Sequence, residues 1–538
     1  MSSRRQAALA ALAALRAVAT EFFAVGFSDE EAVEGMAITE ELRACFQRPA
    51  AASAVAGPMA LSLELLTVVP PELLSIILSQ LDIRALARLA ASCRLLWCDT
   101  PTPSLLPTPG LVESELRRRA EARGLHISSS LPEGALSWVP YLLKREFYDA
   151  LRRQAPLAAG FRYSIFVDKE RRLHLACLRD NIGAGKVGEP LLGHDWGSDA
   201  GASTVSVPPT LVPSMQDRRI VSVASSNWHC LALSAEGEVY SWGNGAHGAL
   251  VHTNGSAMVG PRRIETLARV ESIAAWAFKS AAVDDRGRLF TWGSAEGLTC
   301  LGYELDPETE LQLTPKRVDA LSEDRVTGVA LGLCFTLAVT DAGAVFSFGQ
   351  SGDGALGHGL STSEVLPRRI EALAETGRRF VAVAASWNHC LALTEEGVVY
   401  GWGDRRANGH GQEQRTPRPV AALAGVPVKL VYAQDNLSVA VTEKGELFTW
   451  GPGDPNSFPL GHGVGAAQQT PKRVEALRGV KVASAAVCGT HTLVAGEDDR
   501  VWGFGQRAAL GLSEAHVPPG SYAMQPTPVP NLRVRTLP

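Results

Sequence analysis

Short runs of apolar residues alternate with polar turns from about residue 160 to the C-terminus, a pattern typical of short β-strands. Two such runs flank a turn in HCLALSAEGEVYSWG (229–243) and again in LSVAVTEKGELFTWG (437–451). Val, Leu and aromatic residues dominate the runs, so each block predicts a β-hairpin. Residues 68–97 (VVPPELLSIILSQLDIRALARLAASCRLLW) do not alternate in this way and predict a different kind of structure.

The hairpin block recurs six times, at intervals of 48 to 56 residues measured between its closing aromatic-Gly pairs. The pairs are Trp242-Gly243, Trp292-Gly293, Phe348-Gly349, Trp402-Gly403, Trp450-Gly451 and Phe504-Gly505. A tight hairpin turn needs a residue with positive φ, and the blocks supply one at the same place. These turn residues are Gly237, Gly287, Gly343, Gly397 and Gly445, with Asp499 in the last block.

Each repeat predicts four strands, because one apolar run precedes the hairpin and a further strand-like segment follows it, as in Pro315-Lys316-Arg317-Val318. A unit of about 50 residues with four antiparallel strands buries its faces only when neighbouring units stack on it, as in a β-propeller. Residues 161–177 repeat the hairpin with Arg171 at the turn, which predicts a seventh blade. The predicted fold class is mainly β, a seven-bladed β-propeller over residues 158–538 after an all-α N-terminal region.

Blade one shows no clear strand before Phe161, whereas residues 526–538 hold strand-like residues to spare. We therefore expect the C-terminal segment to pair with blade one and close the ring, which would remove free sheet edges.

The repeat resembles the regulator of chromosome condensation repeat over about residues 158–535. The features that carry the resemblance are the V-A-x-x-x-x-H-x-x-A-L hairpin, the aromatic-Gly pair and the later G-x-L-G-H-G and Pro-basic segments. Kelch propellers have a similar period but carry a Gly-Gly doublet, which this sequence lacks. The family includes a plant UV-B photoreceptor that uses a cluster of tryptophans from successive blades. In this sequence only Trp387 stands at the corresponding repeat position, and the equivalent positions of other repeats hold Asn227 and Ala277, so light sensing is not expected.

Composition narrows the functional classes. The net charge of −5 is spread over both halves of the chain, so binding to nucleic acid is not expected. No apolar run reaches 18 residues, which argues against a membrane partner. Nine scattered cysteines without a C-x-x-C pair indicate buried thiols in the cytoplasm or nucleus.

Several apparent chemical motifs fall at repeated positions. GNGAHG (243–248) and GDGALG (352–357) match G-x-G-x-x-G, but each follows a hairpin strand and opens no helix. His229, His389 and His491 recur at one strand position, which favours structural hydrogen bonding over metal binding. The basic pairs on the last strand of each repeat are followed by acids, typical of a protected sheet edge. We predict no catalytic residue, no cofactor and no metal.

Residues 68–97 predict two amphipathic helices, because apolar residues recur at three- and four-residue spacing on one face. Their order resembles the F-box, which docks on a Skp-type adaptor. The resemblance assigns adaptor contacts to Pro70, Leu73, Leu74, Ile77, Leu78, Leu81, Leu86, Leu89 and Cys93. Leu96 stands at the usual late Trp position, with Trp97 one residue later. The alternative is a helical domain in which the same residues form its own core.

The rest of the N-terminal region is expected to be helical. We assign residues 1–60 to an extension, 61–100 to the F-box and 101–157 to a helical stalk that includes a helix ended by Gly124. Residues 21–46 weakly resemble a ubiquitin-associated domain. The Arg- and Ala-rich residues 1–20 suit either an ordinary helix or a transit peptide.

These modules together predict a non-catalytic substrate receptor of a Skp, cullin and F-box ubiquitin ligase, with an unidentified target protein on the propeller. The alternatives are guanine-nucleotide exchange or other regulation of a small GTPase through the propeller, and a passive scaffold.

Overall fold

The computed structural model describes residues 111–122, 142, 143 and 145, 155–178 apart from 162, and 206–534 with breaks. The breaks are 253–257, 295–299, 306–310, 361, 453–458, 464, 508 and 513–521. The chain divides into two compact units, Met1–Asp149 and Ala150–Pro538.

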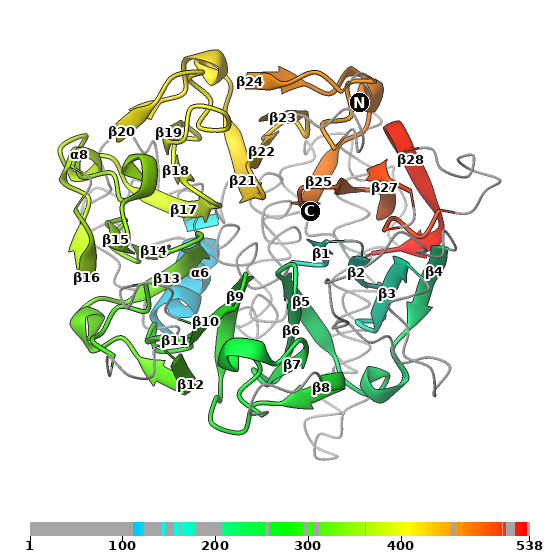
Figure 1. Cartoon of the computed structure of the whole chain (residues 1–538), viewed down its shortest axis with the longest axis horizontal. Coiled ribbons are helices and arrows are strands. Elements are labelled where there is room, and N and C mark those ends of the chain that lie inside the picture. The colour runs from blue at the N-terminus through cyan, green and yellow to red at the C-terminus, as the bar shows by residue number, and fades with distance from the viewer. Residues whose placement is uncertain are drawn as a thin grey trace, which may run out of the picture. The chain divides into compact units, whose positions relative to one another are not determined.

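Seven four-stranded antiparallel sheets form the second unit, arranged as blades around a central axis (Figure 1). The predicted seven-bladed propeller is therefore confirmed. Blades one to three contain β1 (Leu157–Gly160), β2 (Tyr163–Val167), β3 (Leu173–Leu178), β4 (Ser206–Leu211); β5 (Ile220–Ser225), β6 (His229–Ser234), β7 (Val239–Gly243), β8 (Met258–Arg263); β9 (Val270–Trp276), β10 (Lys279–Asp284), β11 (Leu289–Ser294), β12 (Leu311–Arg317). Blades four to seven contain β13 (Val326–Leu331), β14 (Phe335–Thr340), β15 (Val345–Gly349), β16 (Glu364–Arg369); β17 (Phe380–Ala385), β18 (His389–Thr394), β19 (Val399–Gly403), β20 (Gln414–Pro419); β21 (Val428–Gln434), β22 (Leu437–Thr442), β23 (Leu447–Gly451), β24 (Gln468–Arg473); β25 (Val482–Val487), β26 (His491–Gly496), β27 (Arg500–Gln506), β28 (Tyr522–Arg533).

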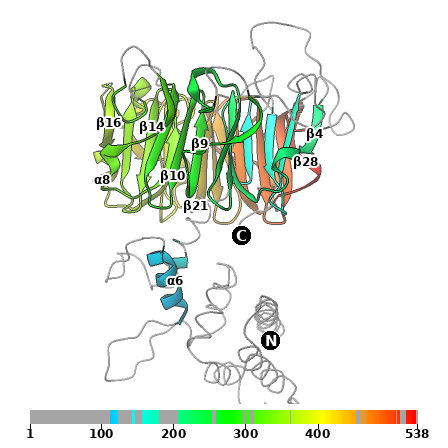
Figure 2. The ribbon, with the colours of Figure 1, turned by 90° about the horizontal axis from the view of Figure 1, so that it is seen from below.

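The antiparallel order gives the propeller two faces. The first strand of each blade lies nearest the axis and the fourth lies on the rim. Connections between strands one and two, and between strands three and four, emerge on one side, which we call the loop face. The two-to-three hairpins and the links between blades emerge on the opposite side, which we call the hairpin face (Figure 2).

The hairpin turns adopt the backbone conformation that the sequence predicts. The five turn glycines have φ between 75° and 84°, Asp499 has φ 65°, and Arg171 of blade one also has φ 65°. Left-handed backbone costs an L-residue free energy, which explains why glycine fills most of these turns. The turn prediction is confirmed in all seven blades.

Buried histidines join neighbouring blades near the loop face. Nε2 lies 2.8 Å from a serine Oγ of the next blade in the pairs His229–Ser280, His389–Ser438 and His491–Ser164. Each serine hydroxyl also donates to a backbone carbonyl oxygen, so Nε2 is the donor in His389 and His491. The prediction of structural hydrogen bonding is confirmed.

The ring closes differently from the expectation. β28 pairs with β27 as the fourth strand of blade seven, and blade one has its own first strand, β1, paired with β2. Among the described residues, the C-terminal segment forms one backbone bridge with blade one, between Asp168 and Val534. Closure instead depends on the His491–Ser164 hydrogen bond and on a buried apolar cluster shared by blades one and seven. The expectation was wrong because β1 (LAAG) has small residues at three of its four positions and lacks an alternating pattern.

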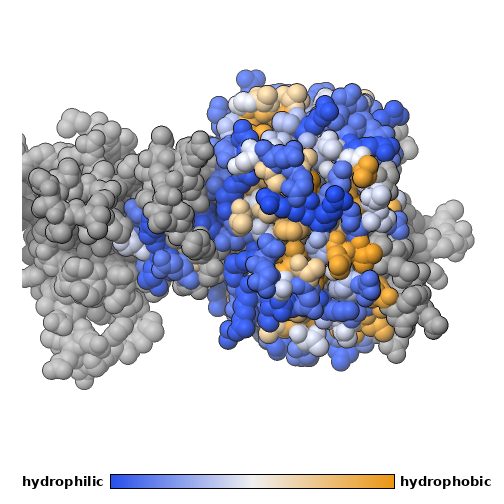
Figure 3. All heavy atoms as spheres, turned by 90° about the vertical axis from the view of Figure 1, so that its left-hand side faces the viewer, coloured by the Kyte–Doolittle hydropathy of each residue, from blue (hydrophilic) through white to orange (hydrophobic). Residues whose placement is uncertain are grey.

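The outermost strands carry the paired charges that the sequence predicts for a protected edge. Arg263 pairs with Glu265 and Arg317 pairs with Asp319, each at 3.4 Å. Figure 3 views the rim on the side of β16 and β20, where hydrophilic residues surround separate apolar spots. Leu360 and Leu366 of blade four are among the exposed large apolar residues of the described chain.

In the first unit, the predicted helix is present as α6 (Leu111–Ala122). Burial raises the pKa of Glu115, but hydrogen bonds from Arg118 and Arg119 more than offset this and hold it below its ordinary value. The predicted F-box, with its nine adaptor-contact residues, the N-terminal extension and the ubiquitin-associated-like segment lie outside the described residues. No helix in the described part of the chain is long and apolar enough to cross a membrane.

Candidate protein-binding face

A single carboxylate joins four blades at the centre of the loop face. Oδ1 of Asp435, from blade six, accepts hydrogen bonds from Nε1 of Trp387 in blade five (3.2 Å) and Nδ2 of Asn227 in blade two (3.4 Å). Oδ2 accepts the backbone N–H of Gly489 in blade seven at 3.0 Å. Blades two and six are not neighbours in the ring, so these contacts span the axis. We call Asn227, Trp387, Asp435 and Gly489 the axial cluster.

A tight turn places Asp435 at this position. Gln434 pairs with Leu437, so only Asp435 and Asn436 connect β21 to β22. Both have positive φ, 48° and 63°, as a two-residue type I′ turn requires, and Asp and Asn tolerate this region better than most residues. The Asn436 N–H donates to Oγ of Ser386 at 3.1 Å, which ties the turn to blade five.

Aromatic side chains pack against Trp387 of the axial cluster and follow Asn227 in the chain. Trp276 at the end of β9 meets Trp387 edge to face, with ring centroids 5.9 Å apart. Trp276 is 7% exposed, whereas Trp387 is 40% exposed. Trp228 stacks on Phe278 at 5.4 Å. Partly exposed aromatic rings held by hydrogen bonds and ring contacts are typical of binding surfaces.

Acceptor atoms are in excess at this centre. The side-chain carbonyl oxygens of Asn227 and Asn436 are buried and have no hydrogen-bond partner among the described residues. The three donors that face Asp435 are already engaged with its carboxylate. Both oxygens are shielded from solvent, whereas Asp435 is partly exposed. A ligand that brings hydrogen-bond donors to the Asp435 carboxylate therefore suits the centre better than one that brings acceptors.

The buried titratable groups near this face are not arranged for acid–base or nucleophilic chemistry. Burial lowers the pKa of His229 and His389 to about 4 and that of His491 to about 3. Burial raises the pKa of the Cys488 thiol to about 12, although the Cys488 sulfur lies 3.1 Å from Nδ1 of His491. A neutral thiol beside a neutral imidazole is not an activated nucleophile. The described residues hold no group of three or more side chains suited to a metal ion.

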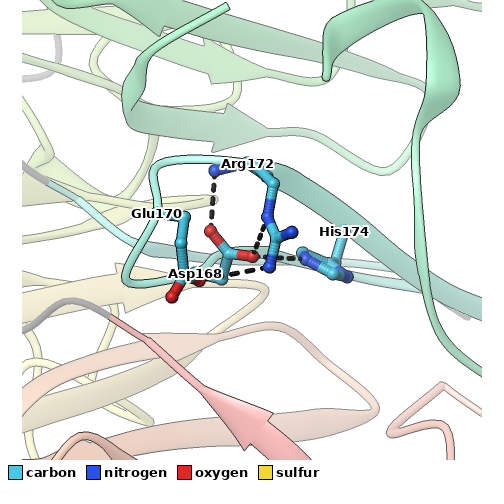
Figure 4. Close-up of polar contacts among 4 residues, drawn as sticks. All are labelled: Asp168, Glu170, Arg172 and His174. Atoms are coloured by element: carbon cyan, nitrogen blue, oxygen red, sulfur yellow. Dashed lines mark hydrogen bonds and ion pairs between the residues drawn. The ribbon is translucent and has the colours of Figure 1, made fainter. Parts of the chain in front are cut away.

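The hairpin face has its own polar cluster, in blade one (Figure 4). The Arg172 backbone N–H and guanidinium each donate to the Asp168 carboxylate at 2.7 Å, and Nε2 of His174 lies 2.8 Å away. Burial raises the pKa of Asp168, but these three hydrogen bonds hold it below its ordinary value. Lys169 pairs with Asp499 of blade seven at 2.7 Å. The cluster secures the hairpin beside the ring closure and leaves the Asp168 carboxylate fully partnered.

The structure adds residues that the sequence analysis did not assign to a site. Asn227, Trp387, Asp435 and Gly489 occupy one repeat position, two residues before His229, His389, Leu437 and His491. The repeat register therefore aligns them, but it does not predict that one blade carries a tryptophan and another an aspartate there, or that Trp276 stands one position earlier in its own repeat. The Asp435-Asn436 pair between two apolar runs is a detectable signal, since such pairs favour type I′ turns. The nine predicted adaptor-contact residues lie outside the described chain, so the structure brings none of them together.

Fold and site define a propeller of tandem four-stranded repeats with an aromatic and acidic centre on its loop face. Family models described as regulator of chromosome condensation (RCC1) repeat match residues 236–283, 342–393 and 444–495, and a second set matches 220–249 and 380–412. The chain therefore contains RCC1 repeats, which confirms the predicted repeat type.

Known proteins share these repeats. The E3 ubiquitin-protein ligase HERC2 of Homo sapiens is 39% identical over 347 residues, which cover 63% of this chain and 7% of HERC2. The ultraviolet-B receptor UVR8 of Arabidopsis thaliana is 32% identical over 294 residues, covering 53% of this chain and 63% of UVR8. The chain thus spans less than two thirds of the length of either relative.

Solved structures share the fold. Prp20p of Saccharomyces cerevisiae aligns with a TM-score of 0.55 at 21% identity, covering 76% of this chain and 91% of Prp20p. Human WBSCR16 aligns with a TM-score of 0.55 at 19% identity, covering 66% and 93%. At these identities the likeness supports the fold alone.

Proposed function

We propose that the chain is a non-catalytic substrate receptor of a Skp, cullin and F-box ubiquitin ligase that acts in the cytoplasm or nucleus. Residues 61–100 bind the Skp-type adaptor, and the loop face of the propeller binds a target protein. The observation that supports the proposal is the F-box-like order of residues 66–98. In the same chain, the RCC1 propeller has the partly exposed axial cluster on its loop face.

The receptor would raise the effective concentration of the target protein near the ubiquitin-conjugating enzyme. A receptor that holds its target beside the conjugating machinery makes transfer to a target lysine nearly intramolecular. A propeller suits this task because its inter-blade hydrogen bonds hold the loop face rigid, so little ordering cost accompanies binding. HERC2, a relative that carries similar repeats, is named as an E3 ubiquitin-protein ligase, which supports pairing this propeller with ubiquitin transfer.

Co-purification tests the proposal. The full chain, co-expressed with a Skp-type adaptor, is expected to retain the adaptor through affinity purification and gel filtration. Pro70→Ala combined with Leu73→Ala is expected to abolish retention, whereas Gln80→Ala, which lies outside the motif, serves as the matched control. An adaptor that the wild type fails to retain, or that the double variant retains equally, refutes the ligase function.

A second candidate is regulation of a small GTPase through a propeller face. It draws on the fold likeness to Prp20p, whose structure is described together with its binding to Gsp1p and histones. Accelerated release of labelled guanine nucleotide from a GTPase panel, lost in Trp387→Leu, would favour this candidate over the ligase function.

A further inference from the structure

The partly exposed Asp435 carboxylate differs from the buried aspartates of the propeller in its partners. Asp168, Asp284 and Asp404 each pair with an arginine two or four residues away. Asp435 receives its hydrogen bonds from neutral donors only, namely an indole, an amide and a backbone N–H. Among the described residues, no Lys, Arg or His nitrogen lies within 4.0 Å of its oxygens. Its negative charge therefore lacks a cation within the described chain.

Trp387 forms a fixed platform beside this charge. The indole N–H bonds to Asp435 and Trp276 packs against the ring, yet 40% of Trp387 remains exposed. A carboxylate that accepts a hydrogen bond from the indole N–H increases the electron density of the ring, which strengthens its attraction for a cation. Aromatic faces of tryptophan bind cations best among the aromatic side chains.

We infer that the axial cluster binds an arginine side chain of the target protein. A guanidinium stacked on the Trp387 ring extends its N–H groups past the ring edge, where Asp435 lies. A planar cation can therefore contact ring and carboxylate together, whereas a compact ammonium favours one of them. This inference rests on the proposed binding of a target at the loop face.

Other ligand classes fit less well. An anion would meet the uncompensated Asp435 charge, and an apolar group would leave that charge unpaired and desolvated. A divalent cation needs several carboxylate or imidazole ligands, and the described residues offer no such group of three.

Peptide binding to the full-length protein tests the inference. The probes are three acetylated, amidated tripeptides, Gly-Arg-Gly, Gly-Lys-Gly and Gly-citrulline-Gly, titrated against tryptophan fluorescence and by calorimetry. We expect the arginine peptide to bind at least about tenfold more tightly than the neutral citrulline peptide, and several-fold more tightly than the lysine peptide. Equal binding of the citrulline peptide overturns the cation site, and equal or tighter binding of the lysine peptide overturns the assignment to arginine.

Variants locate the binding. Asp435→Asn keeps a residue that tolerates positive φ and is expected to weaken arginine-peptide binding about tenfold. Trp387→Leu is expected to weaken it further, and Trp387→Phe to retain part of it, with thermal unfolding verifying that each variant folds. Glu413→Gln removes one exposed, arginine-paired charge from the same face and is the matched control. Unchanged binding in folded Asp435→Asn refutes the inference.

The two proposals fail in different assays. Loss of adaptor retention by the wild type refutes the ligase function, while arginine-peptide binding reports on the axial cluster alone. Asp435→Asn is expected to retain the Skp-type adaptor as well as the wild type does.

Discussion

The hairpin face and the loop face are built from the same repeat but differ in how their polar groups are partnered. On the hairpin face, one position at the end of the second strand carries a side chain that accepts backbone N–H groups of the turn. This position holds Asp168, Ser234, Asp284, Thr340, Thr394 and Thr442. On the loop face, Asp435 instead collects donors from three other blades and lacks a cation. Repeated turns build the ring, and the divergent loops are free to acquire a binding function.

Among single substitutions, the largest effect on stability is expected from crowding the backbone at the loop face. Gly403 ends β19 with φ 88°, and a Cβ there would lie 2.1 Å from the Asn388 carbonyl oxygen. Gly425, on the hairpin face, has φ 74° but nothing within 4 Å of a Cβ. We expect Gly403→Ala to lower the free energy of unfolding by roughly 3 kcal/mol or more, against about 1 kcal/mol for Gly425→Ala. Urea denaturation measures the free energy of unfolding of both variants. Equal losses in Gly403→Ala and Gly425→Ala would contradict the predicted clash.

Acid is expected to weaken the inter-blade hydrogen bonds beside the loop face. Burial lowers the pKa of His229 and His389 to about 4 and that of His491 to about 3, below the ordinary value of 6.5. Above pH 6.5 both folded and unfolded states keep these rings neutral, so their contribution is complete. As pH falls from 6.5 toward 4, these histidines become protonated in the unfolded state but stay neutral in the folded state. Stability then decreases by roughly 1.4 kcal/mol per pH unit for each histidine.

The control variant for this prediction introduces a residue that another blade already has at the equivalent position. Leu437 occupies the equivalent position in blade six, so His389→Leu should fold. Urea denaturation between pH 6 and 4.5 should show a pH slope smaller by one proton in His389→Leu than in the wild type. An unchanged slope would mean that His389 is protonated in the folded state.

An intermediate effect is expected at the hairpin-face cluster of blade one. Asp168→Ala leaves Arg172 and His174 without their shared acceptor beside the ring closure, and should cost roughly 2 to 3 kcal/mol. Glu170 bonds to the same Arg172 from an exposed position, so Glu170→Ala should cost less than about 0.5 kcal/mol. Thermal unfolding separates the two variants. A similar loss in both would show that Asp168 contributes no more than a surface ion pair.

The fold was largely predictable from the sequence, because each hairpin carries its own local signals. Gly397 and even Arg171 adopt the positive φ that the turn alignment predicts. Ring closure was predicted wrongly, since the small residues of β1 carry no strand pattern. The repeat register places Asn227, Trp387 and Asp435 at one equivalent loop position, but the hydrogen bonds that join them depend on side chains that differ between blades, and periodicity does not predict those. Sequence periodicity describes what blades share, whereas this site depends on where they differ.

The smallest effect on stability is expected from removing an exposed ion pair on the hairpin face. The same variant tests which face binds the arginine peptide. Arg378 and Glu396 lie 3.2 Å apart with side chains 41% and 52% exposed. Solvent and salt screen such a pair, so Glu396→Ala should change the free energy of unfolding by less than about 0.5 kcal/mol. Arginine-peptide binding, measured by calorimetry, should also be unchanged, although the variant removes the same charge as Asp435→Asn. If Glu396→Ala weakened that binding as strongly as Asp435→Asn does, the peptide affinity would depend on the net charge of the protein. That result would contradict a specific arginine site on the loop face.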